Sequence, residues 1–348
     1  MTNLPEDPLR EPFVPPSSDS SGPSDSAEQQ AAAPSPFGEN SAAFEPPAPS
    51  FSYPLSTGPE PSNLEPPLFQ SYAQPPVRRP MRIPNFGHLL LLSLLILVAF
   101  SILIIALALA SHFHLFGFRL SQKSATDLGF NLLSEAILYL VTFGLSLWVF
   151  PMVWNQSLFA GLEWRGAVAR TWFGLLAGTA LACFGLAILD QVLMPGPSNA
   201  PIEKMLSSPG AAWMMFAFGI TMAPFFEEMF FRGFLLPALC TACDWIAEKM
   251  RHTLPRPLDA SGHPQWSLPA MVIASVLTSI LFAWLHAEQQ GHSLGPFLLL
   301  VVISMILCTV RLFTRSLAAS TLVHASYNFL IFSVELIATG GFRHFDKM

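Results

Sequence analysis

Two acidic side chains and one basic side chain interrupt an apolar stretch, "APFFEEMFFRGFL", at residues 223–235. A charge at the centre of a bilayer costs roughly 2.5–3.5 kcal/mol on insertion scales, so such groups are paired, face a polar cavity or carry a function. On a helix, Glu228 and Arg232 are four residues apart in the favoured order for an ion pair. Glu227 points about 100° away from that face and has no partner at that spacing, which leaves it available for chemistry. The alternative is a structural ion pair beside a glutamate that faces lipid headgroups.

Two histidines and an amide lie further along the chain. His286 ends the segment "FAWLH", and His324 and Asn328 are four residues apart in "HASYN". A lone histidine at a helix end is commonly structural, whereas His324 and Asn328 put two hydrogen-bond donors on one face of an apolar helix. Together with Glu227 these groups supply a reaction. A glutamate and a histidine can deprotonate a water molecule, and a histidine and an amide can donate to the oxyanion that forms when this water attacks a carbonyl.

Three segments, "EEMFFR", "FAWLH" and "HASYN", match the motifs E-E-x-x-x-R, F-x-x-x-H and H-x-x-x-N in that order. The sequence resembles in this respect the CAAX-prenyl endopeptidase and bacteriocin-processing or immunity family of intramembrane proteases, also called the CPBP or Abi family. The resemblance covers roughly residues 205 to 335. It implies that Glu227 activates water with help from His286, and that His324 and Asn328 form the oxyanion site.

The same resemblance implies a supporting role for Glu228 and Arg232, which would fix the helix and orient Glu227. Members of the family have been described both as metalloproteases and as metal-independent glutamate proteases. We expect a site without a cofactor, because the sequence has no H-E-x-x-H motif. Zinc is the alternative, and the residues that would surround it are Glu227, Glu228, His286 and His324.

The composition is that of an integral membrane protein. Of 348 residues, 52% are hydrophobic and 11% are charged, and the mean hydropathy is +0.47. An ordinary soluble domain carries about 25% charged residues. The clearest apolar run, residues 88–111, contains no Asp, Glu, Lys or Arg. A nucleic-acid partner is excluded because the sequence has no basic tract.

The apolar runs predict an all-α fold, a polytopic membrane bundle of about seven transmembrane helices. The fourth helix is unusual, because 34 helical residues would span about 51 Å and a hydrocarbon core is about 30 Å thick. It must therefore tilt strongly, break near Pro224, or run partly along the interface. The expected helices cover residues 88–111, 129–153, 171–193, 210–243, 267–286, 295–311 and 316–338.

Basic residues predict the orientation in the membrane, which we expect to be the cell membrane. "RRPMR" at residues 78–82 holds the N-terminus in the cytoplasm under the positive-inside rule, and alternation puts the connections at 161–170 and 244–266 on the same side. Straight helices would then place His286 near the outer side and His324 about 12 Å from the inner side. The site can form only if helices tilt or begin elsewhere.

Residues 1–80 differ from the rest of the chain. They contain 19 of the 32 prolines, and residues 1–77 carry a net charge of −9. This composition predicts a disordered, acidic, Pro-rich tail that acts as a solvated tether or docks a partner. The predicted organisation is a tail at 1–80, N-terminal transmembrane helices at 81–204, a protease-like core at 205–338 and a short C-terminal tail at 339–348.

The sequence therefore predicts an intramembrane endopeptidase. Its partners would be the lipid bilayer and a membrane-anchored peptide or protein substrate, either a lipidated CAAX-type tail or a leader peptide. One alternative is a non-catalytic bacteriocin-immunity or scaffold protein. The other is a transporter that uses Glu227 and the histidines to carry protons or cations, although the sequence shows no clear internal repeat.

We expect deletion of residues 1–77 to leave the cleavage of short peptides unchanged, because a solvated tether contributes no group to the site. The measurement is the cleavage rate of a fluorogenic peptide by full-length and truncated protein in detergent. A slower rate for the truncated protein at equal folded concentration would contradict the tether interpretation.

Overall fold

The computed structural model describes residues 82–121, 127–195, 209–259 and 263–343. The predicted tail at 1–80 lies outside these residues. The described part of the chain is helical and contains no β-strand. Seven of its helices are long and apolar enough to cross a membrane, which confirms the predicted polytopic helical fold.

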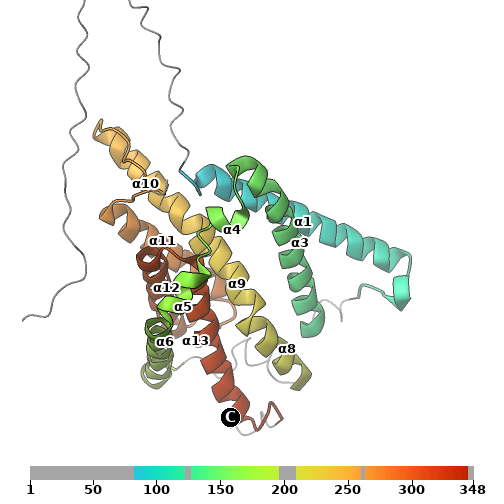
Figure 1. Cartoon of the computed structure of the whole chain (residues 1–348). Helices are drawn as coiled ribbons and strands as arrows, with labels where there is room; N and C mark the ends of the chain where they lie inside the picture. The colour runs from blue at the N-terminus through green and yellow to red at the C-terminus, as the bar shows by residue number, and fades with distance from the viewer. Residues whose placement is uncertain (1–81, 122–126, 196–208, 260–262, 344–348) are drawn as a thin grey trace, which may run out of the picture. The chain divides into compact units, whose positions relative to one another are not determined.

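The long helices lie close to the predicted ranges (Figure 1). Short helices η1 (Leu115–Gly117), α4 (Leu158–Gly161) and α5 (Gly166–Thr171) lie in the connections. The single-segment spans are α1 (Phe86–His112), α3 (Leu128–Trp154), α6 (Phe173–Leu193), α11 (Leu268–His286), α12 (Leu294–Thr314) and α13 (Leu317–Ala338).

Side-chain caps fix where the helices that carry the histidines begin. Ser267 accepts a hydrogen bond from the backbone N–H of Ala270 at the start of α11. Ser316 does the same for Ala319 at the start of α13. Each cap satisfies one of the N–H groups that have no partner within the first turn of a helix.

The fourth span is a composite helix, Pro209–Met250, of 42 residues. It consists of α8 (Pro209–Ile220), α9 (Met222–Glu228), the π-helical segment η2 (Met229–Leu235) and α10 (Leu236–Met250). The helix is interrupted at Thr221, where φ is −123° and ψ is −74°. Pro224 has no N–H to donate to the carbonyl of Ile220, so the interruption agrees with the expected break near Pro224. The composite helix extends seven residues beyond the predicted end at 243, because α10 continues to Met250.

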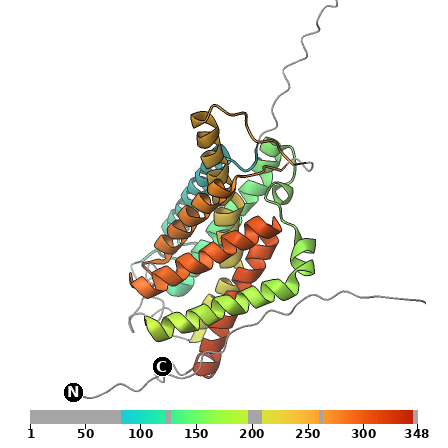
Figure 2. The same ribbon diagram turned by 90° about the vertical axis from the view of Figure 1, so that its left-hand side faces the viewer.

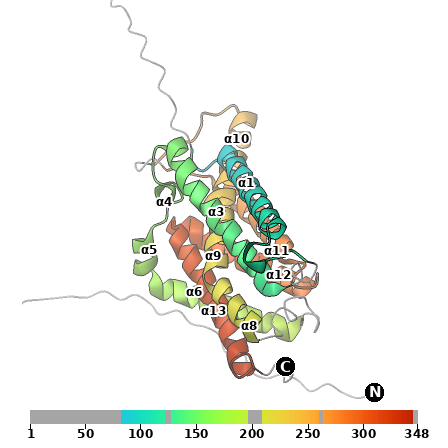
Figure 3. The ribbon, with the colours of Figure 1, turned by 90° about the vertical axis from the view of Figure 1, so that its right-hand side faces the viewer.

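The composite helix runs between two groups of helices (Figures 1 and 3). The α1–α3 hairpin packs on one side through a cluster that includes Leu92, Phe150 and Phe234. On the other side α6, α12 and α13 share a second cluster that includes Leu176 and Leu307. Segments α9 and η2 are therefore the part of the chain that both groups contact.

The inclination of α12 removes the conflict in depth between His286 and His324. In Figure 2, α12 (orange) is strongly inclined to α13 (red). Because of this inclination, the two ends of α12 differ less in depth than they would if α12 were parallel to α13. The start of α13 therefore lies nearer to the depth of the end of α11 than straight, parallel helices would place it. The prediction of a mismatch assumed straight, parallel helices, and that assumption is wrong.

A buried carboxylate ties three connections together at one end of the bundle. Glu163 is 7% exposed, and its carboxylate lies 2.8 Å from the Arg311 guanidinium. Three further basic side chains lie near the same carboxylate: His263 at 3.2 Å, Arg165 at 3.4 Å and Arg315 at 3.7 Å. These residues come from the α3–α6 connection, the α10–α11 connection and the α12–α13 junction. The Glu163 carbonyl also accepts the N–H of Leu317 at 3.1 Å, which joins this cluster to the start of α13.

The start of α1 lies at the same end. Arg82 donates to a carboxylate oxygen of Glu248 at 3.0 Å and to the carbonyl of Arg256 at 2.9 Å. The connections that alternation assigns to one side of the membrane are thus gathered at one end of the bundle. That this end faces the cytoplasm stays a prediction.

We expect Glu163→Gln to destabilise the protein by about 3–5 kcal/mol, because it leaves buried Arg311 without its carboxylate partner. Thermal unfolding in detergent measures the effect, with Glu288→Gln as the control. Glu288 is exposed, and substitutions of this kind usually change stability by less than about 0.5 kcal/mol. Equal unfolding temperatures for the two variants would show that the Glu163 cluster does not hold the helices together.

Candidate active site

A fully buried ion pair lies where α9 passes into η2. Arg232 and Glu228 are both 0% exposed, and the Arg232 Nη1 atom lies 2.8 Å from Glu228 Oε1, so the ion pair expected from their spacing forms. The Arg232 Nη2 atom also donates to the Ser304 hydroxyl at 2.7 Å and to the Ser304 carbonyl at 3.2 Å. The guanidinium therefore fixes the composite helix to α12 while it compensates the charge of Glu228.

His324 connects this ion pair to Glu227. Its Nδ1 atom lies 3.0 Å from Glu228 Oε1, and its Nε2 atom lies 3.7 Å from Glu227 Oε2. A carboxylate can only accept a hydrogen bond, so Nδ1 carries the proton in this contact and Nε2 faces Glu227. Glu228 thus sets the orientation and tautomer of His324, a role that the sequence interpretation had not given it.

His286 approaches Glu227 from α11. Its Nδ1 atom lies 2.8 Å from the carbonyl of Phe282, and its Nε2 atom lies 3.8 Å from Glu227 Oε1. Because the carbonyl is an acceptor, Nδ1 is again the donor and Nε2 points to the carboxylate. Each oxygen of Glu227 therefore faces the Nε2 atom of a different histidine.

The distances around Glu227 leave room for a water molecule. Separations of 3.7 and 3.8 Å exceed those of a direct hydrogen bond, and a bridging water is the usual occupant of such a gap. Glu227 and His286 are partly exposed, at 19% and 21% of their side chains, whereas Glu228 is fully buried. Of the two adjacent glutamates, Glu227 is the one that a substrate can reach.

Asn328 lies one turn after His324 and contacts the interrupted part of the composite helix. Its Nδ2 atom donates to the carbonyl of Gly219 at 2.8 Å. Gly219 lies just before the break at Thr221, where carbonyls lose their partners within the helix. One amide hydrogen of Asn328 is therefore used to hold α8 and α9 in place, and the amide carries a second hydrogen.

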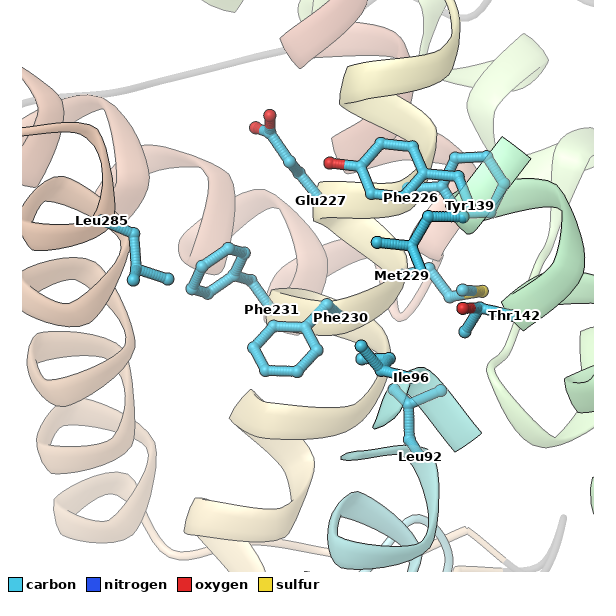
Figure 4. Close-up of a pocket in the computed structure, with 11 residues that line it drawn as sticks. Leu92, Ile96, Tyr139, Thr142, Phe226, Glu227, Met229, Phe230, Phe231 and Leu285 are labelled. Atoms are coloured by element: carbon cyan, nitrogen blue, oxygen red, sulfur yellow. The ribbon is translucent and has the colours of Figure 1, made fainter. Parts of the chain in front are cut away.

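An apolar pocket of about 200 Å³ adjoins Glu227. Figure 4 shows that it extends from Glu227 past Phe230 and Phe231 toward Ile96 and Leu92. Its walls come from α1, α3, α9 with η2, and α11. The pocket therefore places an apolar surface directly beside the reachable glutamate.

Sequence reasoning missed two residues of α3. Tyr139 lines the pocket with Glu227, and its hydroxyl donates to the Glu135 carboxylate at 2.8 Å. Glu135 lies one helical turn before Tyr139, next to the pocket. A signal was present in the sequence, because Glu135 is the only charged residue in the 27 residues of α3.

The four residues considered for zinc do not form a common ligand set. Glu228 Oε1 accepts hydrogen bonds from both Arg232 and His324, so this oxygen is engaged in the buried ion pair. In the part of the chain that the structure describes, no three His, Cys, Asp or Glu side chains are arranged to hold a metal ion.

We expect Arg232→Met to destabilise the protein by about 3–5 kcal/mol, because Glu228 would remain buried without its cation. The double variant Glu228→Gln with Arg232→Met should recover part of this loss, since it removes both charges. Thermal unfolding in detergent gives the coupling. Ser304→Ala is the comparison, because it removes one acceptor of the Arg232 guanidinium and should cost about 1.5–3 kcal/mol. Glu228→Gln is also measured alone. If the losses in stability of the two single variants add up to the loss of the double variant, the result would contradict a direct ion pair.

Comparison with known proteins gives one match. No curated protein and no solved structure matches the chain. Residues 209–330 match the family described as type II CAAX prenyl endopeptidase Rce1-like, and this range lies inside the predicted core at 205–338. The range contains Glu227, Glu228, Arg232, His286, His324 and Asn328. Residues 209–330 are therefore similar to the Rce1-like family, which agrees with the resemblance carried by the three motifs.

Proposed function

We propose that this protein is an intramembrane endopeptidase in which Glu227 activates the attacking water. The Rce1-like domain supports a CAAX-type intramembrane protease in general. The observation that carries the finer proposal is the position of Glu227, whose two oxygens face the Nε2 atoms of His286 and His324 at 3.8 and 3.7 Å. That gap suits one water molecule between an acid and two imidazoles.

The first step is the attack of this water on a peptide carbonyl. Glu227 takes one proton from the water as the oxygen forms a bond to the carbonyl carbon. The lone pair of His286 Nε2 accepts a hydrogen bond from the same water and holds it in place. The hydrogen bond between His286 Nδ1 and the Phe282 carbonyl keeps the imidazole in the required tautomer.

The oxyanion that results needs hydrogen-bond donors. His324 supplies one from Nε2 when its imidazole is protonated, and the Glu228 carboxylate on Nδ1 stabilises that cation. The second hydrogen of the Asn328 amide supplies another. Glu227 then gives the water-derived proton to the peptide nitrogen, and the C–N bond breaks to release an acid and an amine.

The substrate would be a membrane-associated peptide with a large apolar group. The pocket beside Glu227 is lined by Leu92, Ile96, Phe230 and Phe231, and it suits the lipid chain of a CAAX-type substrate or the apolar side chains of a leader peptide. A membrane-anchored substrate would bring that group to the pocket within the bilayer.

The reaction as proposed uses no cofactor. The engagement of Glu228 with Arg232 and His324 supports this choice over a zinc site made of all four candidate ligands. We place the protein in the cell membrane with its N-terminus in the cytoplasm, where its tail at 1–80 could bind a partner.

We expect Glu227→Gln to reduce kcat/KM for peptide cleavage by about 10²–10⁴-fold, the usual contribution of a general base. The measurement uses detergent-purified protein and a library of internally quenched peptides, with and without an S-farnesyl group. Glu288→Gln is the matched control, because it removes an exposed carboxylate after α11 and should leave the rate unchanged.

Each outcome of this assay separates two interpretations. Loss of cleavage in Glu227→Gln with no effect of a chelator supports a glutamate-centred reaction without metal. Loss with chelator and recovery with zinc would overturn the metal-free part of the proposal. Absence of cleavage by the wild-type protein across all peptides would overturn the endopeptidase proposal in favour of an immunity or scaffold protein.

A further inference from the structure

Glu135 is an unexplained charge inside a membrane span. It lies seven residues after the first residue of α3, about 10 Å along the helix axis, and its side chain is exposed. An ionisable group at such a depth is costly unless it faces a polar space or has a partner. The Tyr139 hydroxyl donates to it, but in the described part of the chain no Lys, Arg or His lies within ion-pair distance of its carboxylate.

Tyr139 directs this carboxylate to the active site. Its ring packs against Phe226 at 4.6 Å and against Phe218 at 5.9 Å between ring centroids, which fixes its position beside the composite helix. Figure 4 shows the Tyr139 hydroxyl directed toward the Glu227 side chain. Because Tyr139 lines the pocket together with Glu227 and donates to Glu135, the Glu135 carboxylate lies at the edge of the same site.

Glu135 lies one helical turn beyond the α3 residues that line the apolar pocket. Along α3 the pocket is lined by Leu138, Tyr139 and Thr142 and continues toward Leu92 (Figure 4). Glu135 is one helical turn before Tyr139, in the other direction, and does not line the pocket. A peptide with its apolar group in the pocket and its scissile bond at Glu227 would therefore continue past Glu135.

We propose that Glu135 binds the nitrogen of the leaving fragment, first as a peptide N–H and then as an ammonium group. This inference rests on the proposed function and assigns a residue outside the matched range 209–330. As the C–N bond breaks, the nitrogen receives the water-derived proton from Glu227. It takes a second proton from the carboxylic acid product at neutral pH, and the resulting cation meets the Glu135 carboxylate in a charge-assisted hydrogen bond.

The test measures binding of a tripeptide that carries a C-terminal fluorophore, with either a free or an acetylated N-terminus. Fluorescence polarisation with detergent-solubilised wild-type protein should show about tenfold to hundredfold tighter binding of the free amine, the range expected for a charge-assisted hydrogen bond. Glu135→Gln should remove this preference while the acetylated form binds as before. Tyr139→Phe should reduce the preference, and Glu288→Gln should preserve it.

Two results would overturn the assignment: equal binding of both tripeptides to the wild-type protein, or a preference that survives in Glu135→Gln. Binding of the acetylated form reports folding, so a misfolded variant is recognised. The same preparations are assayed for cleavage. Cleavage without an amine preference contradicts the role of Glu135 alone, whereas an amine preference without cleavage contradicts the endopeptidase reaction and leaves the amine site in place.

Discussion

The buried contact between Glu228 and Arg232 is the interaction on which the rest of the site depends. Neither charge is exposed, so each is stable in the interior only while the other is present. The pair also makes hydrogen bonds to two other helices. Arg232 donates to Ser304 on α12, and Glu228 accepts from His324 on α13. One ion pair thus sets the positions of three helices relative to one another and orients an imidazole.

The same arrangement places two adjacent glutamates in different environments. Glu228 is enclosed and compensated, whereas Glu227 is partly exposed and faces two histidines across gaps of 3.7 and 3.8 Å. Neighbouring carboxylates in unlike environments are a recurrent way to separate structural from reactive acids. The π-helical segment η2 begins directly after Glu228, and the break at Thr221 lies six residues before Glu227. Irregular helix geometry on both sides of a pair of acids is typical of a functional site.

The sequence was sufficient for the spans and for the ion pair between Glu228 and Arg232, because apolar run length and helical spacing depend on local chemistry. The sequence was not sufficient to predict contacts that depend on how the helices cross. The distance between His286 and His324 depends on the inclination of α12, and the contact between Asn328 and Gly219 depends on the break in the composite helix. The cluster around Glu163 joins three connections that are far apart in the chain, and no local pattern indicates such a contact.

The matched family domain covers the groups that we propose to react but only part of the pocket. Residues 209–330 supply Glu227, both histidines and the wall formed by Phe230 and Phe231. The opposite wall comes from α1 and α3, which precede that range and contribute Leu92, Ile96, Leu138, Tyr139 and Thr142. If the chemistry resides in the domain, then the shape of the pocket beside it is determined in part by the α1–α3 hairpin. A chain could therefore keep the six motif residues and change its substrate by changing these two helices. The three motifs alone would not reveal that change, because the pocket residues of α1 and α3 lie outside them.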